Sequence, residues 1–140
     1  MGNNNRAMLY LILFLYLLVP ASSNSDTSSN VHFQQAEQAF KKSNYEESAA
    51  QYKLAIKEFE QQNDKSSLAV AYRNLGRVCR NIGKFEDAFN YLNTAIKMHE
   101  QMADRGEAAI DTTYMAIAYE RQGNYGKAMA LSEKALAVHT

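Results

Sequence analysis

The chain has 140 residues, a net charge of +0 and 46% hydrophobic residues, with one proline and one cysteine. This length accommodates one domain, and the composition is that of a globular protein. The balanced charge argues against attraction of the whole protein to nucleic acid, so we expect no nucleic-acid partner. A single cysteine excludes an intramolecular disulfide framework and a cysteine-rich zinc site. One proline favours long, uninterrupted helices.

Residues 1–21 have the pattern of a secretory signal peptide. Arg6 supplies a positive charge ahead of an uncharged apolar run over residues 7–19. This run is shorter than the roughly 20 apolar residues of a membrane-spanning helix. Cleavage after Ala21 or after Ser23 fits the small residues that follow. The segment predicts a secreted, lumenal or periplasmic protein. The alternatives are an uncleaved anchor, which alone would bring the protein to a membrane, and a cytosolic scaffold.

Residues 22–30 are polar and contain five serines in the stretch SSNSDTSSN. A segment of this composition cannot bury enough apolar surface to fold, so we expect a linker. The folded body is therefore expected over residues 31–140.

Three segments of this body repeat with a period of 40 residues and begin at Asn44, Lys84 and Asn124. Each has an aromatic second residue, a small residue three positions later, and an alanine followed by an aliphatic residue. The matching sets are Tyr45, Phe85 and Tyr125; Ser48, Ala88 and Ala128; Ala55, Ala95 and Ala135; and Ile56, Ile96 and Leu136. Such regularity over three copies indicates a repeat protein.

Apolar residues at three- and four-residue steps before the second and third segments indicate a further helix ahead of each. Asp64 and Asp104 are N-cap candidates, and Glu107 completes the pattern of a capping box. Gly83 and Gly123 are suited to ending helices. We therefore expect an all-α protein with helices over 31–42, 45–61, 64–81, 84–102, 104–122 and 124–138.

The unit resembles the tetratricopeptide repeat. The second copy matches the family pattern best, through Tyr72, Leu75, Gly76, Cys79, Ala88 and Leu92. The resemblance implies an α-solenoid of three helix–turn–helix repeats, over about 31–61, 64–102 and 104–138. The family's tryptophan and proline are absent from every copy, and the period of 40 exceeds the usual repeat of about 34 residues. The lengthened unit resembles the repeats of kinesin light chain and of spindle-orientation scaffolds, whose groove binds peptides.

The sequence contains no catalytic or metal-binding pattern. His32, His99 and His139 lie far apart, and we expect the last two to be solvent-facing or half-packed helix residues. The glycines form no phosphate-binding loop. Glu46 and Glu47 are adjacent and cannot share a helix face as a catalytic carboxylate pair. We therefore expect no enzymatic activity, no cofactor and no metal ion.

Cys79 stands where the family has a tyrosine packed between helices. A small buried thiol is the expected state at this position. The alternative is a reactive thiol, or one that joins two chains in an oxidising compartment.

The resemblance also implies that one stripe of each first helix lines an inner groove. Arg73, Arg77 and Arg80 lie at i, i+4 and i+7, and no acid in that helix segment offsets them. Such a stripe suits either a solvated face or a site for carboxylates, which arginine binds bidentately. The chaperone-tail clamp is not expected, because Phe33 and Glu37 replace its lysine and asparagine. The expected peptide-binding residues are Arg73, Asn74, Arg77, Arg80, Asn81, Tyr114, Ile117 and Arg121.

These observations predict a non-enzymatic binding module that holds a protein or peptide with an acidic segment. The alternative is a structural or self-assembling piece, or a fragment of a longer scaffold or signalling protein. It rests on the last helix, where Leu131, Ala135, Leu136 and Val138 would leave apolar surface uncovered.

Overall fold

The computed structural model describes residues 30–138. Six helices follow one another in this stretch: α2 (Val31–Lys41), α3 (Tyr45–Gln61), α4 (Lys65–Asn81), α5 (Phe85–Gln101), α6 (Arg105–Arg121) and α7 (Tyr125–Ala137). Both ends of every helix lie within one residue of the range expected from the sequence. The described part of the chain contains no strand, so the all-α prediction is confirmed.

Four helices begin at a side-chain cap. The side chains of Asn30, Asp64, Asp104 and Asn124 each accept a hydrogen bond from the backbone N–H three residues later. Such a cap satisfies one of the N–H groups that the first turn of a helix leaves without a partner. The two aspartates were expected from the sequence to serve in this way, and this is confirmed.

All five turns between these helices have the same backbone form. Each contains one residue with positive φ, and these residues follow at intervals of 20: Ser43, Asn63, Gly83, Ala103 and Gly123. Its N–H donates to the carbonyl three residues earlier, and the next N–H donates to the carbonyl five residues earlier. This pair of hydrogen bonds is the Schellman motif, which closes a helix and fixes the exit of the chain. The helix-ending role expected of Gly83 and Gly123 is therefore confirmed.

The largest core cluster lies between the helices of the first two repeats. Buried alanines recur at one point of each second helix: Ala55, Ala95 and Ala135. Small residues at such positions let neighbouring helices approach closely. At Gly76 the approach is closest, because an added Cβ would lie only 2.7 Å from Cγ of Leu92.

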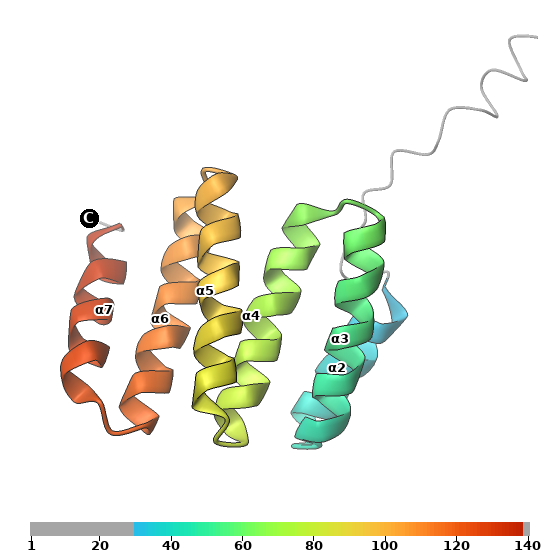
Figure 1. Ribbon diagram of the computed structural model, residues 1–140, viewed down its shortest axis with the longest axis horizontal. Helices are drawn as coiled ribbons and strands as arrows, with labels where there is room; N and C mark the ends of the chain where they lie inside the picture. Colours follow the sequence, from blue (N-terminus) through green and yellow to red (C-terminus); the bar gives the residue numbers. More distant parts are fainter. Residues whose placement is uncertain (1–29, 139–140) are drawn as a thin grey trace, which may run out of the picture.

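The helices form a curved row from the α2–α3 pair to α7 (Figure 1). Each packs against the next one in the chain, and α4 also contacts α6. Within residues 30–138, no comparable contact joins α3 to α5 or α5 to α7. The first helices α4 and α6 are therefore closer to each other than α3 is to α5 or α5 is to α7. This places α2, α4 and α6 on the inner side of an α-solenoid, the fold expected from the sequence.

The last helix, α7, is covered on one side only. Its buried residues are Ala128 and Ala135. The expectation that Ala135 is uncovered is therefore wrong, because α6 packs over it. Leu136 and Val138 are exposed as expected, and Leu131 is half-buried.

The predicted signal peptide lies outside the described residues. The same holds for the predicted linker, except that Asn30 caps α2 and so belongs to the folded body. Between residues 30 and 138, no helix is long and apolar enough to cross a membrane.

Candidate functional site

Three first helices meet around Arg77 on the inner side of the row. The guanidinium carbon of Arg77 lies 4.9 Å from the ring centroid of Phe40 in α2 and 4.7 Å from that of Tyr114 in α6. These cation–π contacts stabilise the positive charge without neutralising it. The sequence left a solvated face or a carboxylate site open at this position, and in the structure Arg77 is half-buried between the two rings.

Two hydrogen-bonding atoms of Arg77 show that its charge is not matched. Nη1 donates to Oδ1 of Asn74 at 3.3 Å, which is a neutral acceptor at long range. Nε is buried and has no hydrogen-bond partner. A buried donor without a partner costs free energy, so this N–H calls for an explanation.

Arg80 and Arg121 bring two more positive charges to this place. The guanidinium carbon of Arg80 lies 5.9 Å from the Tyr114 ring centroid, and its Nε and Nη2 both donate to Oδ1 of Asn81 at 3.3 Å. Burial lowers the pKa of Arg80, and the positive charges of Arg121 and Arg77 lower it further. Arg121 is exposed at the end of α6.

We call Arg77, Arg80 and Arg121 the arginine cluster. Among the described residues, no ion pair joins any of the three to a carboxylate. Glu37 of α2 and Arg77 act in opposite directions on the pKa of the Tyr52 hydroxyl, which the glutamate raises and the arginine lowers. The cluster is therefore a concentration of uncompensated positive charge on the inner side.

Arg73 has a different environment, although it belongs to the same stripe of α4. It is only 9% exposed, and it donates from Nε to Asp111 and from Nη2 to Glu107. Burial lowers the pKa of Arg73, but the hydrogen bonds to Glu107 and Asp111 outweigh this and raise it. Both acids lie on α6, so the absence of acids within α4 does not leave Arg73 unpaired. Arg73 joins the second repeat to the third.

Asp111 extends this contact to α5. Its Oδ2 lies 2.6 Å from Nδ1 of His99, and His99 is only 2% exposed. The prediction of a solvent-facing or half-packed His99 is therefore wrong, because the buried carboxylate gives the imidazole a polar partner. Burial raises the pKa of Asp111, and the hydrogen bonds with Arg73 and His99 act in the opposite direction.

Three contacts were not foreseen from the sequence: those of Arg73 with Asp111 and Glu107, and that of His99 with Asp111. A signal was present, because the residues 40 positions before Arg73, His99 and Asp111 are all apolar. Three simultaneous changes from apolar to ionisable residues at equivalent positions indicate a group of side chains that contact one another.

The remaining expected residues are partly used inside the protein. Asn74 is buried and hydrogen-bonds both Arg77 and the hydroxyl of Tyr52, whose pKa is raised by burial. Asn81, Tyr114 and Ile117 are half-buried. The structure thus brings Arg77, Arg80, Arg121 and Tyr114 into one group, and it separates Arg73 from that group.

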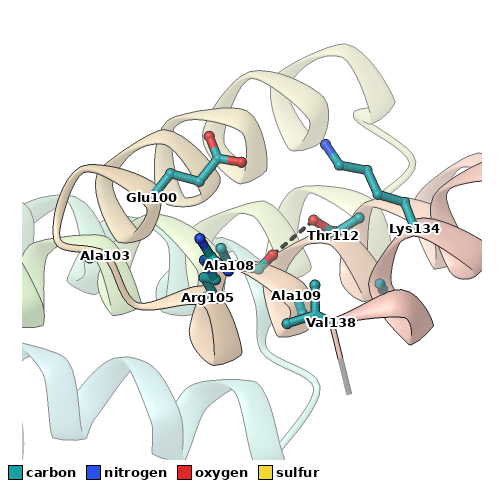
Figure 2. A pocket seen from close by; sticks show the side chains of 9 residues that line it. Glu100, Ala103, Arg105, Ala108, Ala109, Thr112, Lys134 and Val138 are labelled. Carbon is teal, nitrogen blue, oxygen red and sulfur yellow. Dashed lines mark hydrogen bonds between the residues drawn. The ribbon is translucent and has the colours of Figure 1, made fainter. Parts of the chain in front are cut away.

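A separate cleft of about 480 Å³ lies where α5, α6 and α7 meet (Figure 2). Ala108 and Thr112 line it, and they stand 40 positions after the larger residues Leu68 and Tyr72. The smaller side chains of the third repeat therefore leave this space open. The Thr112 hydroxyl already donates to the carbonyl of Ala108 at 2.8 Å, the contact drawn as a dashed line in Figure 2.

Cys79 is buried, as the sequence predicted. Burial raises the pKa of its thiol, so the thiolate that reacts with oxidants or disulfides is disfavoured. Over the part of the chain that the structure describes, no three His, Cys, Asp or Glu side chains gather in a way that could hold a metal ion.

The tetratricopeptide repeat pattern matches residues 27–101, which is more than half of the chain. The chain therefore belongs to the tetratricopeptide repeat family, as its sequence indicated. The crystal structure of the TPR domain of Arabidopsis FLU is similar, with a TM-score of 0.71 and 17% sequence identity over 76% of this chain and 89% of that one. At this identity the likeness shows the fold alone. No curated protein matches the chain. Proteins of this family are typically protein-interaction modules without enzymatic activity.

Proposed function

We propose that this protein is a non-enzymatic binding module whose inner side holds an acidic segment of a protein partner. The observation that supports this is the arginine cluster, where three guanidinium groups have no carboxylate partner among the described residues. Arg73 shows the alternative in the same helix, since its charge is met by two acids of the protein itself. A ligand carboxylate would supply the cluster with the negative charge and the hydrogen-bond acceptors that Asp111 and Glu107 supply to Arg73.

Such a site can strengthen binding through direct hydrogen bonds, and it can also raise the rate of association with an acidic partner. Guanidinium groups bind carboxylates through paired N–H donors, and these charge-assisted hydrogen bonds are among the stronger ones in proteins. Like-signed charges on one face also accelerate the approach of an acidic partner. This steering fades as salt increases, because screening acts over about 8 Å at physiological ionic strength.

Fluorescence anisotropy with two libraries of labelled peptides tests the proposal. One library contains Asp and Glu at random positions, and the other carries Asn and Gln at the same positions. We expect the acidic library to contain binders whose affinity falls as salt is raised. Arg121→Glu should weaken them by about tenfold or more, because it adds a repulsion to the lost attraction. Since Arg121 is exposed, the fold should remain intact.

Lys97→Glu is the matched control, because it makes the same change of charge on an exposed position of α5. It should leave affinity nearly unchanged. Equal binding of both libraries, or equal losses in Arg121→Glu and Lys97→Glu, would contradict the proposal.

Self-association is a second candidate function, supported by the uncovered side of α7. Tyr125, Met129 and Leu136 are 68%, 66% and 65% exposed. Of the equivalent residues in the second repeat, Ile96 is buried, and Phe85 and Phe89 are half-buried. A second copy of the chain would remove this apolar surface from water. Light scattering after size-exclusion chromatography should then show a dimer that Leu136→Glu converts to a monomer. A wild-type monomer at high concentration would count against it.

We also propose that the protein enters the secretory pathway, on the strength of the short apolar run over residues 7–19. Mass spectrometry of the protein from its native cells should find a mature N-terminus at residue 22 or 24. A chain that begins at Met1 and stays with the membrane would indicate an anchor instead, and one found in the cytosol would indicate a scaffold there.

A further inference from the structure

The arginine cluster carries more positive charge than one carboxylate can offset. Arg77 and Arg80 both lie against the ring of Tyr114, at 4.7 and 5.9 Å from its centroid. After burial, the positive charge of Arg121 is the next cause that lowers the pKa of Arg80. Arg73, one turn earlier, meets two acids for a single guanidinium. By comparison with Arg73, the three guanidinium groups of the cluster require a ligand with more than one negative charge.

The donors still free in the cluster favour an anion with several oxygen atoms. Arg77 uses Nη1 on Asn74, and Arg80 uses Nε and Nη2 on Asn81, all at 3.3 Å and all to neutral amide oxygens. These hydrogen bonds are long and exchangeable for stronger, charge-assisted ones. The buried Nε of Arg77 has no partner at all. A planar carboxylate has two oxygens, whereas a phosphoryl group presents three oxygens and about two negative charges.

The aromatic contacts explain how this charge is kept in place without a ligand. Phe40 and Tyr114 each contact the Arg77 guanidinium from a neighbouring first helix. These contacts use no hydrogen-bond acceptor, so they leave the N–H donors of the guanidinium to other partners. The side chain is thus ordered before binding, which reduces the entropy lost when the ligand binds.

We propose that Arg77, Arg80 and Arg121 form a site for a phosphomonoester dianion, held beside Tyr114 on the inner side of the repeats. This rests on the proposed function, since it uses the same face, and it adds the chemical class of the group that the face prefers. The phosphoryl group can belong to a phosphorylated side chain of a protein partner or to a small phosphate compound. Its binding depends on the second ionisation of phosphate, near pH 6, and the titratable groups around it are Tyr45, Tyr52, Tyr114 and the exposed Glu37.

The test is NMR of the arginine Nε–H groups in the 15N-labelled full-length protein at constant ionic strength. The probes are phosphoserine-containing peptides, the same peptides with glutamate or serine in its place, and inorganic phosphate. We expect a saturable shift of the Arg77 Nε–H signal and binding of the phosphoserine form about tenfold tighter than the glutamate form. Affinity should rise between pH 5 and pH 7 as the phosphoryl group loses its second proton.

Arg121→Gln should weaken phosphopeptide binding about tenfold while leaving the rest of the spectrum unchanged, because Arg121 is exposed. Arg105→Gln is the matched control, since it removes an equally exposed arginine from the same helix outside the cluster. Saturation by inorganic phosphate as tight as by the peptide would assign the site to small phosphates, and weaker saturation would assign it to a protein partner. Both results support the proposal.

Three results would overturn the proposal, and they separate it from the proposed function. If the glutamate peptides bind as tightly as the phosphoserine ones, the preference for phosphate is wrong and acidic-segment binding stands. If neither binds, both are wrong. If Arg105→Gln weakens binding as much as Arg121→Gln, the protein attracts anions without a defined site.

Discussion

Between the first and second repeats, Phe33, Phe59 and Ala71 lie in one buried cluster, and the two phenyl rings are 6.2 Å apart. Between the second and third repeats, 40 residues later, the same positions hold Arg73, His99 and Asp111, which are hydrogen-bonded to one another through the aspartate. One junction is apolar and the other is made of ionisable groups, yet the turns between the helices that meet there have the same backbone form. The space between the helices must be filled, and any polar atoms placed there must have partners. Apolar side chains meet this requirement at the first junction, and paired ionisable side chains meet it at the second.

The two junctions differ in how they respond when one member is lost. The apolar junction loses contacts in proportion to the volume removed. The ionisable junction exposes its remaining members to a low-polarity environment without a partner, which is far more costly than the pair itself is stabilising. A buried ion pair is therefore weak evidence for a net gain in stability, although removal of one partner is costly.

The largest effect is expected from Asp111→Ala. It removes the shared partner of Arg73 and His99, and we expect a loss of about 3 kcal/mol in the free energy of unfolding, measured by urea denaturation. Glu107, which still contacts Arg73, keeps the loss at the lower end of the range for buried pairs. Glu120→Ala, an exposed position of the same helix, should change stability by less than about 0.5 kcal/mol. A loss below about 1 kcal/mol for Asp111→Ala would show that the contact is not made in solution.

Replacing the residues of the second junction by those of the first is expected to raise the free energy of unfolding or leave it unchanged, in contrast to Asp111→Ala. The triple variant Arg73→Phe/His99→Phe/Asp111→Ala places at the second junction the residues that already fit the first. Replacement of buried ionic groups by packed apolar ones is commonly neutral or stabilising by about 1–4 kcal/mol. The comparison is sharpest if the triple variant is more stable than Asp111→Ala and also keeps its affinity for acidic peptides. A loss of affinity for acidic peptides in the triple variant would show that Arg73 takes part in binding after all.

The smallest effect concerns the turn that precedes α4 at the first junction and α6 at the second. The residue with positive φ is Asn63 in one and Ala103 in the other, at φ 53° and 58°. Asparagine tolerates this conformation better than alanine does, and glycine adopts it without strain. Ala103→Gly should raise the free energy of unfolding by about 0.5–1 kcal/mol, and Asn63→Ala should lower it. A destabilised Ala103→Gly protein in calorimetry would contradict the geometry of this turn.

The sequence was sufficient for the helices and the order of the repeats, because these depend on periods that local residues reveal. Gly83 and Gly123 identified two of the five turns. The N-cap candidates Asp64 and Asp104 indicated the turns at Asn63 and Ala103, and the turn at Ser43 followed from the period. None of these three turn residues is a glycine, so their positive φ could not be read from residue type. The alanines that the repeat places at positions 55 and 95 are buried in the structure.

The candidate site was harder to predict, because a side chain's partner can lie one repeat away. Arg73 and Arg77 look alike within α4, and nothing local distinguishes them. The difference arises from what α6 places opposite each one, Asp111 in the first case and Tyr114 in the second. Only the alignment of the chain with itself at an offset of 40 residues could have indicated this, by showing that position 111 corresponds to Ala71.

The turn residues at intervals of 20, from Ser43 to Gly123, divide the chain into helices that alternate between the inner and the outer side of the row. An insertion of one helix and one turn would preserve every local structure downstream. It would nevertheless exchange first and second helices, so α6 would fall on the outer side and Tyr114 would leave Arg77. An insertion of two helices and two turns would leave every later helix on its original side. Gene rearrangement can therefore lengthen this protein in whole repeats, while half a repeat would yield a folded chain whose arginines face a different surface from their aromatic partners.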